Sequence, residues 1–569
     1  MTESVLDHRR SIRLIILGLV GLLMAVGALV PMTPASAQPS DTYYVNTTAD
    51  APDQTPNDGM CDIPVAPGDP SLCSLRAAIE TANEVAGEQV ITFANPSMTI
   101  VLLDSLPPVE GPADIHGFPA NAGSPGTTID GNGEEFGFEL VAPGSQLHGL
   151  QIGGFTHRAV LLGGGEVYAN QFEGNHITST GSGAAVIVAL GGANVQDNVH
   201  DNLILDNEGT AIESFGTAAL ITNNGIANNT GAGIIVHGSF TTISGNAISG
   251  NGGAGVAVVS LDPGFQPDPT GVEVVGGIFE GNVGPAIDLG DDGPTPNDPG
   301  DHDPGPNDLM NYPVLTSVTT STSSPFTTRI EGTFDGTTPA TLRFYSSSLT
   351  TCNRDGFFVA QSPISVAGPF DITLPIQLES GSFESATATD ENHSTSEFSD
   401  CRQSVASTQV SEPVASGGSV STDTGSGATS SDPVVLSLTN GSSSTVDATL
   451  TEVDCTATPD DPLCLPAPVG NTVGDVGIST GAPASALKGT TAAPSSGPGP
   501  YTATLIYDAS VSTGNLKRFQ AFDSGSLLAT CSRRVTTHCL ISLKRLSGSK
   551  DLQVKVALAA SARLYVRQV

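Results

Sequence analysis

A repeat of constant length runs from Val199 to Val256 and limits the possible folds more than any other feature of the chain. Aligned in rows of 22, the sequence places β-branched residues, asparagine and glycine in fixed columns. The columns are Val199, Ile221, Ile243; Asn202, Asn224, Asn246; Ile204, Ile226, Ile248; Asn207, Asn229, Asn251; Gly209, Gly231, Gly253; and Ile212, Ile234, Val256. Such a period is typical of a solenoid whose coils stack about 4.8 Å apart.

The residue types in the columns decide which solenoid this is. Leucine-rich repeats carry runs of leucine and one asparagine or cysteine per repeat, and calcium-binding nonapeptide repeats have a shorter period. Here β-branched residues suit a narrow core, and glycine and asparagine suit corners with positive φ. The sequence therefore predicts an all-β protein built on a right-handed parallel β-helix, which we place at residues 94–290. We expect the stacked asparagines to hydrogen-bond along the stack, which is a structural role.

The coils upstream of the regular repeat are longer. Between Leu147 and Ala185 the pattern returns at a wider spacing, which predicts that Ile152, Ile177 and Ile204 share a register. A further insertion lies around Leu261 to Thr270. Loops on one side of a rigid stack are where a binding site is expected.

The N-terminus predicts export. Arg9, Arg10 and Arg13 precede an apolar run from Leu14 to Val30, and a small-residue cleavage site follows before Gln38. We interpret residues 1–37 as a signal peptide and place the mature protein outside the cell or at its surface. The alternative is an uncleaved anchor helix, because an apolar run of this length is close to the shortest that spans a bilayer.

An amphipathic helix is predicted after Cys73. Ser74 can cap its start, and four apolar residues share one of its faces: Leu75, Ala78, Ile79 and Ala82. The open end of a solenoid exposes core and unpaired strand groups, so we expect this helix to cover that end.

The segment 41–93 resembles the CSLREA-type N-terminal domain of exported bacterial proteins. The motif reads Cys-Ser-Leu-Arg-Ala-Ala-Ile from Cys73 here, with Val-Asn-Thr-Thr-Ala-Asp from Val45, Asp-Gly-Met-Cys from Asp58 and Val-Ile-Thr-Phe from Val90. Ala77 stands where the motif has glutamate, which removes a capping-box partner for Ser74. The resemblance implies an exported solenoid and no particular reaction.

The chain changes character after the solenoid. Residues 291–311 are rich in Asp, Pro and Gly, and we expect them to close the solenoid. Alternating strands at 312–404 predict a small sandwich, residues 405–432 are rich in Ser, Gly and Thr and predict a flexible linker, and 433–569 predict a second antiparallel β domain.

Eight cysteines form four sequence-local pairs. The pairs are Cys61 with Cys73, Cys352 with Cys401, Cys455 with Cys464, and Cys531 with Cys539. In an exported chain this pattern predicts disulfides. Zinc binding is the alternative, although the chain has no Cys-x-x-Cys motif.

Charge and composition narrow the possible partners. The chain has 20 basic and 58 acidic residues, and its excess of negative charge repels nucleic acid, which is therefore not an expected partner. The chain has no tryptophan, which argues against a sugar-binding surface made of aromatic rings. Sugar binding in a polar groove is still compatible with the composition. Polysaccharide or a surface protein is the expected partner.

Catalysis has to be considered because many parallel β-helices act on polysaccharides. A pectate-lyase-like site needs a basic residue, and Arg158 is the one candidate between Arg76 and Gly290. A glycosidase needs two carboxylates, and Asp197, Asp201 and Asp206 stack over uncharged residues of the next coil. No catalytic residue is assigned, and the alternative function is a polysaccharide lyase or glycoside hydrolase of the pectin-lyase-like type.

The candidate metal site lies in the acidic loop after the solenoid. Asp298, Asp301, Asp303 and Asp308 offer hard oxygen ligands within one short stretch of chain, which suits calcium. The alternative is a solvated acidic linker. Taken together, the sequence predicts a non-catalytic, exported β-helix protein that acts in adhesion or ligand display.

Overall fold

The computed structural model describes residues 41–55, 58–64, 72–120, 126–177, 185–191, 196–261, 267–321 and 326–422, and beyond these mainly the strands between 434 and 568. The predicted signal peptide and the cysteines Cys455, Cys464 and Cys531 lie outside the described residues. Within the described ranges, no helix has the length and apolar character needed to cross a membrane.

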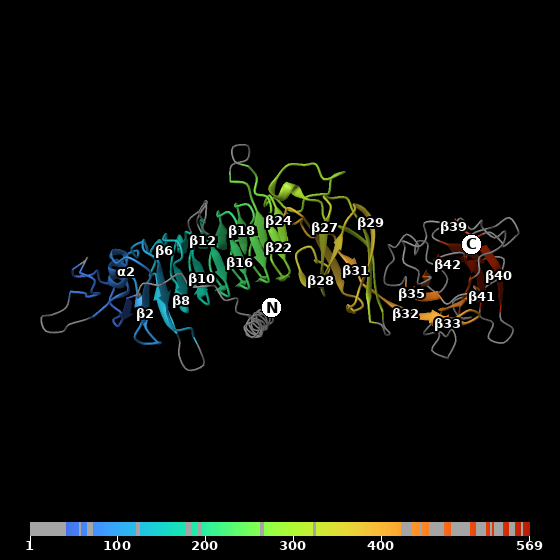
Figure 1. The fold of residues 1–569 in the computed structure, drawn as a ribbon, viewed down its shortest axis with the longest axis horizontal. Helices are drawn as coiled ribbons and strands as arrows, with labels where there is room; N and C mark the ends of the chain where they lie inside the picture. The colour runs from blue at the N-terminus through green and yellow to red at the C-terminus, as the bar shows by residue number, and fades with distance from the viewer. Residues whose placement is uncertain are drawn as a thin grey trace, which may run out of the picture. The chain divides into compact units, whose positions relative to one another are not determined.

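Three parallel sheets form a β-helix in which each coil from β4 onward contributes one strand to each sheet (Figure 1). The first sheet contains β1 (Thr42–Val45), β2 (Gln89–Phe93), β4 (Ala113–His116), β7 (Gln146–His148), β10 (Glu166–Tyr168), β13 (Asn198–His200), β16 (Leu220–Thr222), β19 (Thr242–Ser244) and β22 (Glu273–Val275). The second contains β3 (Thr99–Val101), β5 (Thr127–Asp130), β8 (Leu150–Gly153), β11 (Gln171–Glu173), β14 (Leu203–Leu205), β17 (Gly225–Ala227), β20 (Ala247–Ser249) and β23 (Ile278–Glu280). The third contains β6 (Phe136–Leu140), β9 (Arg158–Leu162), β12 (Ala185–Ala189), β15 (Thr210–Ser214), β18 (Ile234–Val236), β21 (Val256–Val258) and β24 (Ile287–Leu289).

The predicted repeat columns are confirmed as inward-facing stacks. Ile204, Ile226 and Ile248 pair in register and are fully buried. The residues on either side of each point outward, because side chains alternate along a strand. In the first two sheets the three-residue strands therefore give one inward residue per coil with an outward position on either side, whereas in the third sheet two residues per strand face inward, as Ile234 and Val236 do on β18.

The asparagine columns form two buried ladders, as predicted. Asn202 Nδ2 donates to Asn224 Oδ1 at 3.0 Å, and Asn224 Nδ2 donates in turn to Asn246 Oδ1 at 3.0 Å. The same oxygen atoms accept the backbone N–H of the asparagine one coil before, so each amide also satisfies a turn group. The ladders are therefore part of the fold and are closed to ligands.

One predicted register is wrong. Strand pairing places Phe172 between Ile152 and Ile204, with a short coil on one side and a long coil on the other. Ile177 lies instead beside Gly209, following a bridge between His176 and Glu208. The three isoleucines are almost evenly spaced in sequence, which suggested coils of nearly equal length. The coils differ in length because their connections differ, whereas their strands do not.

The N-terminal helix covers the first coils, as predicted. Helix α2 (Leu75–Glu84) begins after Ser74, whose side chain accepts from Ala77 N at 3.0 Å. Its four predicted apolar residues are buried in one cluster with Ile91 and Ile100. Ala77 is fully buried, so no room is left for the glutamate of the related motif.

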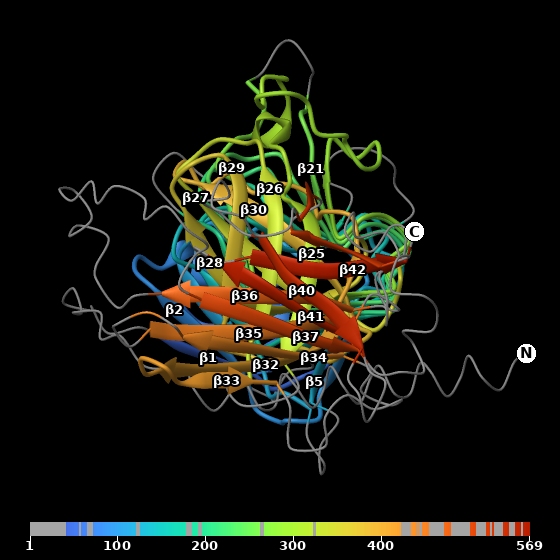
Figure 2. The same cartoon turned by 90° about the vertical axis from the view of Figure 1, so that its right-hand side faces the viewer.

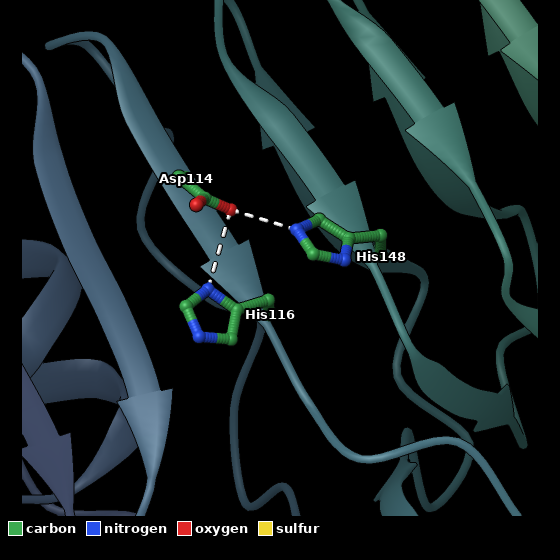
Figure 3. A group of neighbouring side chains, drawn as sticks. All are labelled: Asp114, His116 and His148. Atoms are coloured by element: carbon green, nitrogen blue, oxygen red, sulfur yellow. Dashed lines mark hydrogen bonds and ion pairs between the residues drawn. The ribbon is translucent and has the colours of Figure 1, made fainter. Parts of the chain in front are cut away.

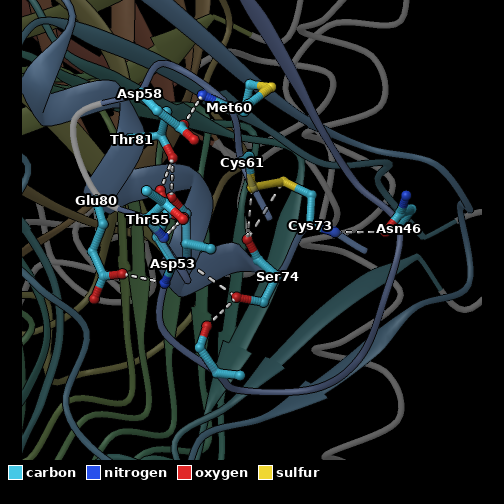
Figure 4. Close-up of a disulfide and its surroundings, with 12 residues drawn as sticks. Asn46, Asp53, Thr55, Asp58, Met60, Cys61, Cys73, Ser74, Glu80 and Thr81 are labelled. Carbon is cyan, nitrogen blue, oxygen red and sulfur yellow. Dashed lines mark hydrogen bonds between the residues drawn. A yellow bond between two sulfur atoms is a disulfide. The ribbon is translucent and has the colours of Figure 1, made fainter. Parts of the chain in front are cut away.

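The motif residues upstream of this helix hold it in place (Figure 4). Asn46 Oδ1 accepts from Cys73 N at 2.9 Å, and Arg76 makes two hydrogen bonds of 2.8 Å to the Asp50 carboxylate. The predicted disulfide between Cys61 and Cys73 is present. Cys352 and Cys401 are also disulfide-bonded.

The last strand of the solenoid ends at Leu289, just before the acidic loop, whose Leu309 packs against the core cluster, and an antiparallel extension also covers this end. Strand β28 (Gly356–Ile364) pairs with β23, and β27 (Ala340–Ser347) and β30 (Phe383–Asp390) follow in the same sheet. Phe279 of the last coil meets the rings of Tyr345 and Phe398, with centroids 6.5 and 5.5 Å apart. Aromatic side chains therefore cover the end of the core.

A second compact unit comprises 315–333, 369–384 and 401–569. One sheet contains β29 (Gly368–Leu374), β26 (Thr328–Phe334), β25 (Val314–Ser321), β32 (Val405–Val414), β35 (Val446–Asp454), β36 (Thr472–Ser479), β42 (Ala562–Gln568), β38 (Phe519–Asp523) and β39 (Ser526–Leu527). The other contains β33 (Ser419–Ser421), β34 (Val434–Asn440), β37 (Tyr501–Tyr507), β41 (Leu552–Leu558) and β40 (Cys539–Arg545). Figure 2 shows β32, β35 and β36 side by side.

The boundaries after residue 311 differ from the predicted ones. Residues 334–368 and 385–400 pack with the β-helix, so the segment 312–404 is divided between the two units. The predicted linker 405–432 contains β32, which pairs with β35 along most of its length. A Ser- and Thr-rich composition does not prevent a strand when a partner strand supplies its hydrogen bonds.

Candidate ligand-binding site

A polar groove lies on the outer face of the second sheet. Thr128, Gln151 and Gln171 occupy the same outward position on β5, β8 and β11, in register from coil to coil. Asp130 and Glu173 flank them two residues further along their strands. These side chains line a groove of about 320 Å³. It offers amide, hydroxyl and carboxylate groups from successive coils.

Glycine keeps the centre of the groove open. Gly153 of β8 lies between Asp130 and Glu173, and a Cβ atom there would collide with the Glu173 carbonyl oxygen. Gly154 has a φ of +80°, which favours glycine. Asp130 Oδ1 accepts from Asn132 N at 2.9 Å, and Glu173 Oε2 accepts from the Gln171 amide at 2.8 Å.

A ladder of stacked rings runs along the outer face of the first sheet. His116, His148, Tyr168 and His200 follow one another on β4, β7, β10 and β13. Their ring centroids are 5.3, 4.4 and 4.9 Å apart, with interplanar angles of 20°, 11° and 3°. The ring faces cover one another, so this ladder cannot serve as a platform for sugars, which need exposed faces.

Asp114 lies beside the first two rings of the ladder. Its Oδ1 atom is 3.0 Å from His148 Nε2 and 3.4 Å from His116 Nδ1. Burial on its own would raise the pKa of Asp114, but the hydrogen bond from His148 and the charges of both histidines lower it overall. The carboxylate is therefore held in its charged form.

The three acids considered for glycosidase chemistry do not converge on one site. Asp201 and Asp206 have positive φ and occupy the corner positions that Asn223 and Asn228 fill in the next coil. Asp197 is almost fully buried, and its carboxylate accepts from the backbone N–H groups of Gly164 and Gly191. Their roles in this fold are structural.

The burial of Asp197 predicts a specific dependence of stability on pH. Burial raises its pKa from 3.8 to about 6, and the N–H groups of Gly164 and Gly191 only partly oppose this. The folded state therefore binds the proton more tightly, so the stability contributed by protonation is fully present below about pH 4 and is lost as pH rises through 6. In thermal unfolding, wild-type Tm should fall relative to Asp197→Asn between these values. Asp201→Asn is the corner control, and parallel profiles for wild type and Asp197→Asn would contradict the prediction.

Arg158 does not act as a free base in this structure. Its guanidinium lies 2.5 Å from Glu139 Oε1 and 4.4 Å above the centre of the Phe136 ring. These contacts lie on the third sheet, away from the groove on the second. An ion-paired guanidinium does not accept protons, so a lyase role for Arg158 gains no support.

The four predicted calcium ligands are spread along their loop. Asp298 accepts from His302 N, while Asp301 accepts from Asn311 N at 2.8 Å and Thr337 N at 2.9 Å. Asp303 has a buried oxygen without a hydrogen bond, and burial raises the pKa of Asp308. Among the described residues, these four do not form a group of three with ligand atoms within 4.8 Å. Calcium binding there stays a prediction.

A second cavity adjoins this loop. Its volume is about 530 Å³, and it lies between the end of β24 and the Asp/Pro/Gly-rich loop, which contains the short 3-10 helix η1 (Pro306–Leu309). Asp268, from the predicted insertion after Leu261, contributes to its lining, as do Asp292 and Thr295. The insertion therefore borders a cavity, as the sequence suggested for loops of this kind.

Sequence reasoning singled out neither the groove residues nor the histidines of the ladder. The groove residues, His116 and His148 lie before Val199, in the coils that do not follow the regular repeat. The available signal was local: polar residues at outward positions beside a buried one, as in Thr-Thr-Ile-Asp at Thr127 and Ala-Asp-Ile-His at Ala113. Only the pairing of the strands shows which of these positions are neighbours.

The comparisons with known proteins agree with the architecture. Residues 144–294 match the family model described as a right handed beta helix region. No curated protein matches the chain. The matched range covers the coils from β7 to β24, so this part of the chain is a right-handed parallel β-helix.

Proposed function

We propose that this protein is an exported, non-catalytic β-helix protein that binds polysaccharide in the groove on β5, β8 and β11 and so serves in adhesion or ligand display. The groove is the observation that carries the proposal. Its side chains repeat at the spacing of the strands, about 4.8 Å, and amides and carboxylates hydrogen-bond well to sugar hydroxyls. The solenoid holds them rigidly, which limits the entropy lost on binding.

Charge favours neutral glycans over acidic ones. The chain has a formal net charge of −38, which repels a polyanion, and Asp130 and Glu173 add negative charge at the groove itself. We expect the strongest binding with uncharged polysaccharides. Calcium could reverse this order by bridging carboxylates, so each polysaccharide should be tested with calcium and with chelator. Calcium binding by the wild-type chain without glycan, weakened in Asp301→Asn, would separately support the predicted ligands Asp298, Asp301, Asp303 and Asp308.

Binding should depend on the two glutamines at the centre of the groove. We expect Gln151→Ala/Gln171→Ala to weaken glycan binding at least about tenfold, because each amide loses hydrogen bonds worth about 1 kcal/mol or more. Titration calorimetry of the full chain with a panel of neutral and acidic polysaccharides measures this. Gln146→Ala, on the neighbouring sheet, is the matched control. Unchanged affinity in the double variant, or no binding by wild type, would refute the proposal.

Glycoside hydrolysis is the second candidate. Asp130 and Glu173 face the same groove on strands separated by one, which puts their backbones about 10 Å apart. Inverting glycosidases hold their two carboxyl groups about 6.5–9.5 Å apart. Release of new reducing ends by wild type, abolished in both Asp130→Asn and Glu173→Gln, would favour hydrolysis over display.

A further inference from the structure

Two histidines and an aspartate meet on the outer face of the first sheet. Asp114 and His116 are two positions apart on β4, so they lie on the same face of the strand. His148 of β7 pairs directly with His116 in the register of the two strands. The parallel pairing of consecutive coils therefore gathers three side chains that are commonly found as ligands of transition metals.

The spacing of their polar atoms suits one metal ion (Figure 3). Asp114 Oδ1 lies 3.0 Å from His148 Nε2 and 3.4 Å from His116 Nδ1. All three ligand atoms lie within 4.8 Å of one another. Ligands of tetrahedral zinc, at about 2.0–2.1 Å from the ion, are about 3.3 Å apart. Small movements of the side chains are enough to place an ion between them.

The environment of His116 supplies a second observation. Its Nδ1 atom is buried, and its contact with Asp114 Oδ1, at 3.4 Å, is longer than a good hydrogen bond. A buried nitrogen with only a long ion-pair contact is weakly satisfied, and a metal ion would stabilise it. The His148 ring is also fixed before any ion binds, because it stacks between His116 and Tyr168. A fixed ring loses little freedom on binding a metal.

We propose that Asp114, His116 and His148 bind a divalent transition-metal ion, with Zn²⁺ as the representative ion and a position left for water. Two imidazole nitrogens and one carboxylate favour zinc and its neighbours over calcium, which prefers oxygen ligands. The surrounding charge helps, since the chain is strongly acidic and residues 41–290 contain no lysine. The site lies on the first sheet and is separate from the glycan groove.

The test is metal binding by the full chain purified without a polyhistidine tag. Titration of Zn²⁺ against a chromophoric chelator should show one tight equivalent in wild type. Affinity should fall at least about 100-fold in His116→Gln/His148→Gln and should also fall in Asp114→Asn. Co²⁺ in place of Zn²⁺ should give the intense visible absorption of a four- or five-coordinate site. His200→Gln, in the same ring ladder, is the matched control and should bind as wild type does.

Several outcomes would overturn the proposal. One is a wild-type affinity for zinc no higher than that of the double histidine variant. Another is a loss of zinc affinity in His200→Gln equal to the loss in that variant. The third is a weak cobalt absorption spectrum, which is typical of an octahedral site. Circular dichroism and thermal unfolding without metal establish that the variants remain folded. Zinc should raise the Tm of wild type and leave that of the double variant unchanged. The Gln151→Ala/Gln171→Ala variant should bind zinc normally, so failure of this proposal is distinct from failure of glycan binding.

Discussion

Replacing Asn229 with alanine is expected to destabilise the β-helix by about 2–6 kcal/mol. Asn229 is buried in the second asparagine ladder. Its Oδ1 accepts from Asn207 Nδ2 at 2.9 Å and from Asn207 N at 3.2 Å, and its Nδ2 donates to Ile204 O at 3.0 Å and Asn251 Oδ1 at 2.9 Å. Alanine leaves the Asn207 N–H and the Ile204 carbonyl buried without these partners, at about 1–3 kcal/mol each.

The measurement is chemical denaturation of the full chain, followed by circular dichroism. Asn228→Gly is the matched control, because Asn228 has a φ of +57° at a corner where the next coil carries Gly250. We expect that change to stay within about 1 kcal/mol. Equal effects at 228 and 229 would show that the ladder contributes no more than any corner residue.

Replacing Phe172 with alanine is expected to cost about 3–5 kcal/mol. Phe172 is fully buried between Ile152 and Ile204, in the coil whose register the spacing of isoleucines did not reveal. Neighbouring coils cannot collapse into the space, because their backbones are held at the strand spacing by the ladder hydrogen bonds. Removing the ring therefore leaves a cavity and costs the hydrophobic transfer energy as well.

Thermal and denaturant unfolding of Phe172→Ala and Leu103→Ala test this expectation. Leu103 is 72% exposed, so its truncation should change stability by less than about 0.5 kcal/mol. A small effect at Phe172 would contradict the strand pairing that places Phe172 in the core between Ile152 and Ile204. It would favour the predicted register, in which Ile177 occupies that position.

The regular coils could be read from the sequence with little error. Wherever the coil length is constant, every inward isoleucine and valine and every ladder asparagine has the neighbour that the columns predicted. The N-terminal helix was also predictable, because Ser74 and its apolar face are local signals. The disulfide between Cys61 and Cys73 follows the pairing expected from sequence.

The candidate sites were not predictable in the same way. A long coil separates His116 from His148 and a short one separates Gln151 from Gln171, so neither pair follows the period of the repeat. Clustered aspartates at 298–308 looked more like a site because they are close in sequence. Among the described residues, no three of these aspartates have carboxylate oxygens within 4.8 Å of one another, and calcium binding there stays a prediction.

The sequence by itself determined the class of fold and the content of the core, because a solenoid repeats one local pattern and each coil contacts only its neighbours. The tertiary structure alone decided which outward side chains meet, because that depends on the length of each connection and not on the strands. It also decided how the solenoid ends, since β27 and β28 add to its last coil only through pairing of segments distant in sequence. Polar side chains on the surface gain their neighbours from the register of the strands, whereas the buried side chains of the regular coils are specified by the periodicity of the sequence.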